Sequence, residues 1–154
     1  MKKITLKLGD ILQLDSEING FINPETNEVI FKGFLKQNLS VILKYELKDL
    51  SDFLIKEKTK IEEIRNSFIE KYGEKNENGI MVKMFDEIKN DEGQIISKLF
   101  TKNYMDFNSE YSTFLNVEKE IEYPEITKDD LKGIGLTKDD YKVLFMLINK
   151  EETI

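Results

Sequence analysis

Three glutamates at alternate positions of the sequence, Glu118, Glu120 and Glu122, are spaced to act together. Alternate side chains of a β-strand lie on one face, so a strand would separate these carboxylates from the mainly apolar groups between them. We call the three residues the acidic ridge. The carboxylates that could extend it are Glu125, Asp129 and Asp130. Such a ridge could bind a basic partner or a hard cation, or it could be the solvated face of an edge strand that charge protects from pairing.

The residue types that the chain lacks exclude several classes of enzyme. It contains no Cys, no His and no Trp. Without a thiol or an imidazole there is no cysteine nucleophile, no histidine base, no disulfide and no ordinary zinc or haem site. Paired carboxylates can also cleave glycosidic bonds, but the chain has no Trp to line a sugar-binding cleft. We therefore expect a non-enzymatic protein with no catalytic residues, no metal site and no cofactor.

The polar segment from Glu74 to Gly79 resembles the start of an EF-hand calcium loop, with oxygen-bearing side chains at alternate positions and glycine at the sixth. An EF-hand loop also needs a glutamate at position twelve, which binds calcium through both carboxylate oxygens. That position is Phe85 in this chain. The sequence therefore favours an ordinary polar hairpin loop.

The segment from Leu131 to Gly135 contains a Gly-x-Gly pattern like that of helix-hairpin-helix modules, whose backbone amides bind a DNA phosphate. The sequence predicts that a helix follows at once, as it does in those modules. That helix would begin with Asp139 and Asp140, whose carboxylates would repel a phosphate from its N-terminus. The favoured interpretation is therefore a turn between two capped helices.

The overall charge argues against nucleic acid and membrane surfaces as partners. The 154 residues include 30 acidic and 23 basic side chains, which gives a net charge of -7, whereas phosphate-rich surfaces attract a positive face. Two lysines follow Met1, but no apolar segment follows them, and no apolar run approaches the ~18 residues of a membrane span. We expect one domain, residues 1–154, with no signal peptide and with no direct nucleic-acid or membrane partner.

Apolar residues at helical spacing predict one long helix from about residue 34 to residue 72. No Gly lies between Phe34 and Tyr72, and no Pro does either. Leu47 and Leu50 are expected in the core. Glu57 and Lys58 interrupt the apolar stripe, so we expect the helix to bend or to leave the core there, with Lys58 in solvent.

Shorter elements are expected on both sides of this helix. Asp10 is placed to cap a first helix that ends at Asn19-Gly20, because Gly accepts the left-handed conformation of a helix end. A hairpin within residues 80–100 and a strand at 117–123 are expected to form one small, mainly antiparallel sheet.

Two copies of the segment Thr-Lys-Asp-Asp begin at Thr127 and Thr137. In each copy the Thr is placed to cap a helix and the second Asp to occupy its third position. Two helix starts are therefore expected, and the second helix should run to Ile148.

Four aromatic residues at helical spacing mark one face of a further helix: Tyr104, Phe107, Tyr111 and Phe114. Aromatic side chains are enriched at protein interfaces, so this stripe could anchor a partner. Such a stripe is more often part of a core, which is the interpretation we favour.

The segment Leu43–Gly73, which contains Glu-Glu-Ile-Arg-Asn-Ser-Phe-Ile-Glu-Lys-Tyr-Gly, resembles small acidic proteins of AT-rich tailed phages, whose function is unknown. A second similarity covers Phe107–Asn116 and the strand-like Val117–Ile121 that follows. Together they cover half of the chain in outline. The resemblance implies a phage or prophage source and a place in the host cytoplasm or the virion. It carries no catalytic residue over to this chain.

These observations predict an α+β fold with a long central helix, two or three shorter helices and a small, mainly antiparallel sheet. The helical part would cover about residues 8–73 and the mixed part about 74–150. We expect a non-enzymatic phage-type accessory protein that acts by protein–protein contact, as a virion or assembly component. The alternative is an inhibitor of a host defence factor, such as a CRISPR effector or another nuclease, whose acidic surface competes with nucleic acid. In either case the expected binding residues are the acidic ridge and its extension.

Overall fold

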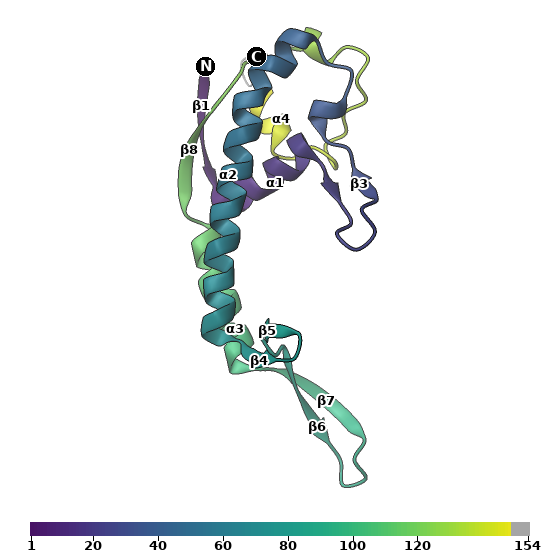
Figure 1. The fold of residues 1–154 in the computed structure, drawn as a ribbon, viewed down its shortest axis with the longest axis vertical. Helices are drawn as coiled ribbons and strands as arrows, with labels where there is room; N and C mark the ends of the chain where they lie inside the picture. Colours follow the sequence, from purple (N-terminus) through teal and green to yellow (C-terminus); the bar gives the residue numbers. More distant parts are fainter. Residues whose placement is uncertain (149–154) are drawn as a thin grey trace. The chain divides into compact units, whose positions relative to one another are not determined.

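The structure is a computed structural model that describes residues 1–148. Its α-helices are α1 (Leu8–Asn19), α2 (Val41–Tyr72), α3 (Lys102–Leu115) and α4 (Leu144–Leu147). Short 3₁₀ helices cover Phe34–Lys36 and Asp129–Leu131. Its strands are β1 (Lys2–Lys7), β2 (Phe21–Ile22), β3 (Val29–Phe31), β4 (Glu74–Asn76), β5 (Gly79–Met81), β6 (Phe85–Lys89), β7 (Ile95–Phe100) and β8 (Glu118–Tyr123) (Figure 1).

The expected α+β class is confirmed, with α2 as the long central helix and small antiparallel sheets beside shorter helices (Figure 1). The strand pairing differs from the expectation that residues 80–100 and 117–123 share a sheet. The strands of residues 1–148 form four separate two-stranded sheets, and β8 pairs with β1. Alternating apolar residues indicate a strand but do not name its partner, so the packing of the whole chain decides the pairing.

The hairpin expected within residues 80–100 is confirmed as β6 and β7, and another hairpin precedes it. The polar segment that begins at Glu74 is itself a strand, because β4 pairs with β5 from Glu74–Met81 to Asn76–Gly79. The second hairpin pairs β6 with β7, with Phe85 opposite Phe100. Residues 82–84 separate the two hairpins.

Helix α2 begins at Val41, later than the expected start at Phe34. The Ser40 hydroxyl accepts a hydrogen bond from the N–H of Leu43 at 3.1 Å, which is the geometry of an N-cap. Before it, the 3₁₀ turn Phe34–Lys36 buries the Phe34 ring completely. The apolar spacing is continuous through this region, but the cap at Ser40 sets where the helix starts.

Helix α1 begins at Leu8, so the expected cap at Asp10 is wrong. Asp10 instead lies in the first turn, where a negative charge is favoured by the helix dipole. The expected end is confirmed: Gly20 follows α1 with a φ of 75° and donates its N–H to the Ser16 carbonyl. Any side chain there would collide with backbone, because a Cβ on Gly20 would lie 2.4 Å from the Phe31 carbonyl oxygen.

The two Thr-Lys-Asp-Asp segments form the expected local hydrogen bonds. The Thr127 hydroxyl donates to the Asp130 carboxylate, and the Asp130 N–H donates back to that hydroxyl. Thr137 and Asp140 make the same two bonds. The first segment leads only into a three-residue 3₁₀ turn, Asp129–Leu131.

The helix expected to run from Thr137 to Ile148 is reduced to the four residues of α4, Leu144–Leu147. The Glu17 carboxylate accepts hydrogen bonds from the backbone N–H groups of Val143 and Leu144. A continuous helix would direct those N–H groups to carbonyls four residues earlier. The side chain from α1 therefore starts a new short helix in place of the predicted one.

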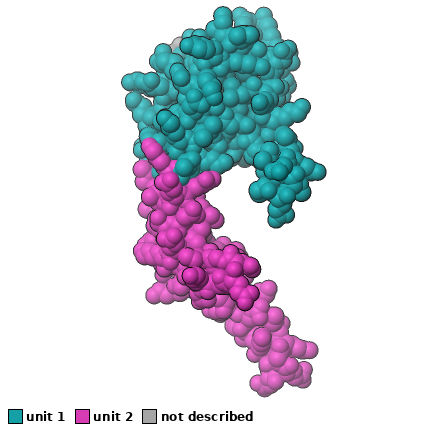
Figure 2. All heavy atoms as spheres, in the orientation of Figure 1, with its two compact units in different colours: residues 1–59, 118–154 teal, residues 60–117 magenta. Residues whose placement is uncertain are grey.

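Two compact units make up the chain (Figure 2). Unit 1 contains residues 1–59 and the chain from Glu118 onward, and unit 2 contains residues 60–117. The boundaries of these two units do not coincide with those of the helical part (about residues 8–73) and the mixed part (about 74–150) that the sequence distinguishes. The fully buried side chains of unit 1 include Ile11, Leu14, Ile18, Phe34, Leu47, Leu50, Leu54, Ile121, Ile126 and Leu144. The buried residues of unit 2 are Ile61, Thr101 and Phe107.

The prediction that Lys58 lies in solvent is confirmed, and α2 passes from unit 1 to unit 2 after Thr59, but Glu57 does not interrupt the buried face. Glu57 lies on the buried face, and its carboxylate accepts a hydrogen bond from Lys119 Nζ at 2.6 Å. Lys58 Nζ lies 3.9 Å from the carboxylate of Asp15, which is also buried. A one-dimensional pattern cannot show the partner that neutralises a buried charge, which is why Glu57 was expected to break the stripe.

Leu47→Ala is expected to lower the free energy of unfolding by about 2–5 kcal/mol, because truncation of a fully buried side chain leaves a cavity. Lys56→Ala, at an exposed position of the same helix, is the control and should change it by no more than about 0.5 kcal/mol. Urea denaturation measures both values. Equal losses at the two positions would contradict this assignment of helix faces.

Candidate interaction surfaces

The acidic ridge lies on the exposed face of β8, as the alternation predicts. The opposing strand β1 places lysines against it. Lys3 Nζ lies 3.7 Å from the Glu120 carboxylate and 3.8 Å from that of Glu122, and Lys7 is the register partner of Glu118. Three carboxylates thus face two ammonium groups, and this sheet face is nearly balanced in charge.

The three residues expected to extend the ridge also have partners within unit 1. Glu125 pairs with Lys2 at 3.5 Å, and Asp129 pairs with Lys132 at 3.0 Å. Asp130 accepts hydrogen bonds from the N–H and the hydroxyl of Thr127. The role of the ridge and its extension in binding stays a prediction, and the lysines beside them offset part of their negative charge.

The other face of β8 is part of the unit 1 core. Ile121 and Tyr123 are buried, and Lys119, two residues before Ile121 on the same face, reaches the buried Glu57. Lys119 Nζ also lies 5.4 Å from the centre of the Phe53 ring, where the face of an aromatic ring attracts a cation. The ion pair therefore has a packing role that fixes β8 against α2.

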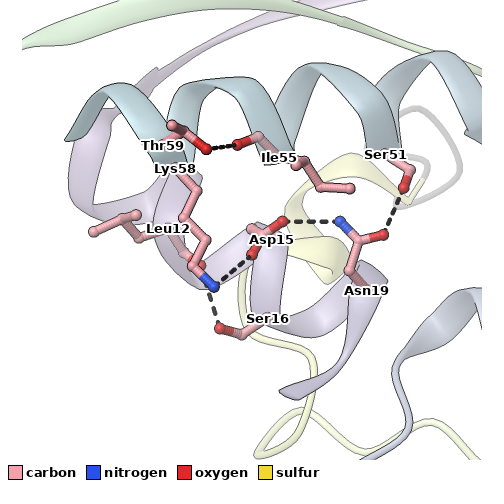
Figure 3. A network of polar contacts seen from close by, with 8 residues as sticks. All are labelled: Leu12, Asp15, Ser16, Asn19, Ser51, Ile55, Lys58 and Thr59. Atoms are coloured by element: carbon pink, nitrogen blue, oxygen red, sulfur yellow. Dashed lines mark hydrogen bonds and ion pairs between the residues drawn. The ribbon is translucent and has the colours of Figure 1, made fainter. Parts of the chain in front are cut away.

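A polar network links α1 to α2 (Figure 3). Asn19 Nδ2 donates to the buried Asp15 carboxylate at 2.8 Å, and the Ser51 hydroxyl donates to Asn19 Oδ1. Lys58 approaches the same carboxylate from α2. Because every member has a hydrogen-bond or charge partner, the network fits structural cross-linking of two helices better than catalysis.

Glu17 is a buried carboxylate that sequence analysis missed. It is 1% exposed, and it accepts hydrogen bonds from the N–H of Val143 at 3.0 Å and of Leu144 at 3.1 Å. Burial raises the pKa of the Glu17 carboxyl above its ordinary value, and the hydrogen bonds from Leu144 and Val143 oppose that rise. Only its i, i+3 spacing from Leu14 in the apolar stripe of α1 could have indicated its burial.

A pocket of about 410 Å³ opens beside Glu17. The residues that line it include Phe21, Phe31, Asp139 and Asp140. Glu17 is already bound to backbone N–H groups, and Asp140 is bound to the Thr137 hydroxyl. Glu17 and Asp140 therefore serve the fold, and we assign the pocket no ligand.

Two sequence motifs that suggested ligands form ordinary local structure. Residues 74–81 form the β4–β5 hairpin, in which the Asn76 side chain accepts a hydrogen bond from the Asn78 N–H. No group of three acidic residues in the described part of the chain is arranged to hold a metal ion. After the Gly133–Gly135 turn, the helix expected at once is absent, and the next helix begins at Leu144. That turn therefore lacks the helix N-terminus that a phosphate site would use.

The aromatic stripe lies on α3 in unit 2. Phe107 is buried, as expected for a core residue, whereas Tyr104, Tyr111 and Phe114 are half-buried. Phe68 of α2 packs edge-on against Phe114 with ring centres 6.2 Å apart. The aromatic side chains of this stripe therefore pack mainly within unit 2, where they hold α3 against α2.

The β6–β7 hairpin exposes many apolar side chains. Every residue of β7 is exposed, with Ile96 at 64% and Leu99 at 57%. The other large apolar side chains exposed on or beside the hairpin are Met84, Ile88, Ile95 and Phe100. Large exposed apolar patches are typical of interaction surfaces in other soluble proteins.

The base of this hairpin is firmly attached to α3. The Thr101 N–H donates to the Met84 carbonyl at 3.0 Å, and the Thr101 hydroxyl donates to the Lys83 carbonyl and caps α3 at Tyr104. Phe100 stacks between Phe85 and Tyr104, with ring centres 4.9 and 5.3 Å away. The exposed strands therefore project from an ordered base.

No family model, no curated protein and no solved structure matches this chain. None of the helices within residues 1–148 combines the length and the apolar character that a membrane span requires.

Glu17→Gln is expected to remove one component of the pH dependence of stability. Because the folded-state pKa of Glu17 lies above the ordinary 4.5, the folded protein binds that proton more tightly than the unfolded chain does. The free energy of unfolding should therefore fall as pH rises from about 4.5 through the raised pKa. The amide keeps an oxygen for Val143 and Leu144 but carries no charge, so this fall should disappear.

Urea midpoints of the parent and the variant across that pH range measure the difference. Glu25→Gln, at an exposed position, is the matched control and should keep the profile of the parent. If Glu17→Gln also kept that profile, Glu17 would not be the buried group that titrates.

Proposed function

We propose that this protein is a non-enzymatic accessory protein that acts by protein–protein contact, and that the β6–β7 hairpin is its contact element. The observation that carries the proposal is the complete exposure of β7, a strand of six residues that includes Ile95, Ile96, Leu99 and Phe100. Burial of apolar surface stabilises a complex by about 25 cal/mol per Å² before the costs of association are subtracted. A partner that covers the apolar side chains of the hairpin would therefore form a more stable complex than one that contacts the acidic ridge.

The isolation of the hairpin supports the same proposal. Its two strands form a complete sheet by themselves, and an isolated two-stranded hairpin is only marginally stable in water. Residues 90–94 close it with a turn in which the Asn90 side chain accepts hydrogen bonds from the N–H groups of Glu92 and Gln94. A partner that extends the sheet or covers its faces would add the stability that two strands lack. The phage-type setting, as a virion or assembly component, is part of the proposal and rests on the sequence resemblance.

A photo-cross-linking amino acid at position Ile96 should join the protein to its partner in the expressing cell, because this side chain is 64% exposed. The same amino acid at Glu120, on the acidic ridge, is the matched control and should give little product. Mass spectrometry of the products identifies the joined chain. Products from position Glu120 and none from Ile96 would contradict the proposal and direct attention to the ridge.

The alternative function, inhibition of a host nuclease by an acidic surface, makes a different prediction. It requires the acidic ridge to steer a basic partner, so exchange of Glu118, Glu120 and Glu122 for Gln should slow association, and the effect should shrink as salt rises. Because Lys3 and Lys7 already face these carboxylates, we expect the triple variant to bind its partner within about twofold of the parent at every salt concentration. Association rates at low and high salt decide between the two functions, and a strong salt-dependent loss would favour the inhibitor.

A further inference from the structure

We propose that Asn78 is a site of spontaneous modification, deamidation to aspartate and isoaspartate, and that the polar network around Asn19 protects a second Asn–Gly bond from the same reaction. The chain contains two Asn–Gly bonds, Asn19–Gly20 and Asn78–Gly79. Water is the only co-reactant that the reaction needs. The two bonds have opposite surroundings in the structure, and that difference carries the proposal.

Deamidation begins when the backbone nitrogen of the following residue attacks the side-chain carbonyl carbon of asparagine. A new C–N bond forms, the bond to the amide nitrogen breaks, and the proton of the attacking N–H passes through water to the ammonia that leaves. Water then opens the resulting succinimide at either carbonyl, which gives aspartate or isoaspartate. Glycine in the following position favours the attack, because no Cβ obstructs the approach. The attack requires a side-chain amide that can rotate and a backbone N–H that has left its acceptor.

The Asn19–Gly20 bond meets neither requirement (Figure 3). Asn19 Nδ2 donates to the Asp15 carboxylate at 2.8 Å, and Asn19 Oδ1 accepts a hydrogen bond from the Ser51 hydroxyl. Both polar atoms of the side-chain amide are therefore held, and Asp15 and Ser51 are themselves buried. The Gly20 N–H donates to the Ser16 carbonyl at 2.9 Å. Attack at this bond therefore requires three hydrogen bonds to open together.

The fold cannot avoid this reactive pair by replacing its glycine. Gly20 has a φ of 75°, and a Cβ there would lie 2.4 Å from the Phe31 carbonyl oxygen and 2.5 Å from that of Lys32. The Asn19 side chain in turn links α1 to Ser51 of α2. The hydrogen bonds that join the two helices are thus the same ones that hold the amide away from the attacking nitrogen.

The Asn78–Gly79 bond lies in the exposed turn between β4 and β5. Both residues are exposed, and a Cβ added to Gly79 would meet no atom within 4 Å. The backbone N–H of Asn78 donates to Asn76 Oδ1 at 2.8 Å. Within residues 1–148 no hydrogen bond holds the side-chain amide of Asn78. This amide is therefore free to rotate toward the Gly79 nitrogen.

The Gly79 N–H is also easily freed. Gly79 is the register partner of Asn76 at the end of the β4–β5 ladder. Every residue of both strands is exposed, and a two-stranded hairpin is only marginally stable in water. Local opening of such a segment requires little free energy. Both requirements of the attack are therefore met at Asn78.

The modification would change the β4–β5 hairpin in two ways. Either product adds a negative charge beside Glu77. Isoaspartate also lengthens the main chain by one carbon atom between Asn78 and Gly79, which is incompatible with the tight turn that sets the pairing of Gly79 with Asn76.

Peptide mapping by mass spectrometry, on the full chain stored at neutral pH and physiological temperature, tests the proposal. Asn78 should deamidate at least about tenfold faster than Asn19, because each of the three hydrogen bonds at Asn19–Gly20 slows the attack about 2- to 10-fold. In concentrated urea the chain is unfolded, and the two rates should converge because both sites are then Asn–Gly bonds in an open chain. This comparison uses the parent protein alone.

Ser51→Ala removes the hydrogen bond to Asn19 Oδ1. It should speed deamidation at Asn19 about 2- to 10-fold and leave the rate at Asn78 unchanged. Ile121→Val is the matched control, because it removes one methylene group from a fully buried side chain of unit 1 and lowers global stability by a similar amount. It leaves the hydrogen bonds of Asn19 in place, so the rate at Asn19 should stay that of the parent. Circular dichroism checks that both variants are folded.

Equal rates at the two sites of the folded parent, or a slower rate at Asn78, would overturn the proposal. A difference that persists unchanged in urea would also overturn it, since local sequence and not structure would then set the rates. If Ser51→Ala deamidated at Asn19 like the parent, or if Ile121→Val sped that reaction equally, the protective role of the network would be refuted.

Discussion

Unit 1 depends on the burial of the leucine stripe of α2. Leu43, Leu47, Leu50 and Leu54 are all buried, and burial of each such side chain contributes about 1.5–3 kcal/mol. Charged groups that share the buried face must then be neutralised, because an unpaired charge away from water costs more than one leucine contributes. The pair Glu57–Lys119 and the network around Asp15 satisfy this requirement, and both tie α2 to a neighbouring element.

The same requirement explains how the end of the described chain is held. A four-residue helix and a 3₁₀ turn have too few internal hydrogen bonds to persist alone, yet Tyr141, Val143, Leu144 and Leu147 are buried. Glu17 supplies hydrogen-bond acceptors to the first N–H groups of α4. The burial of the apolar side chains around it offsets the free-energy cost of removing its carboxylate from water. Local Thr–Asp bonds shape the turns, and the long-range bond from α1 holds them in place.

Unit 2 has few buried residues, so it has little need of paired charges in its interior. Phe107, Ile61 and the capping residue Thr101 form its interior, while the strands of both hairpins stay exposed. The acidic ridge of unit 1 is the more conspicuous feature of the sequence, but cross-strand lysines reduce its charge. The exposed apolar side chains of β7 are the less conspicuous feature. Their burial by a partner would lower the free energy more than contact with the acidic ridge would.

The sequence by itself determined the α+β class, the end of α1 at Gly20, the burial of Leu47 and the exposed face of the acidic ridge. These depend on the 3.6- and two-residue periods of helices and strands and on the conformational freedom of glycine, all of which act locally. Only the tertiary structure decided the pairing of β8 with β1, the isolation of the β6–β7 hairpin, and the burial of Glu17 and Glu57. These depend on which distant segments meet, because a strand needs a partner and a buried carboxylate needs a donor that local sequence does not supply.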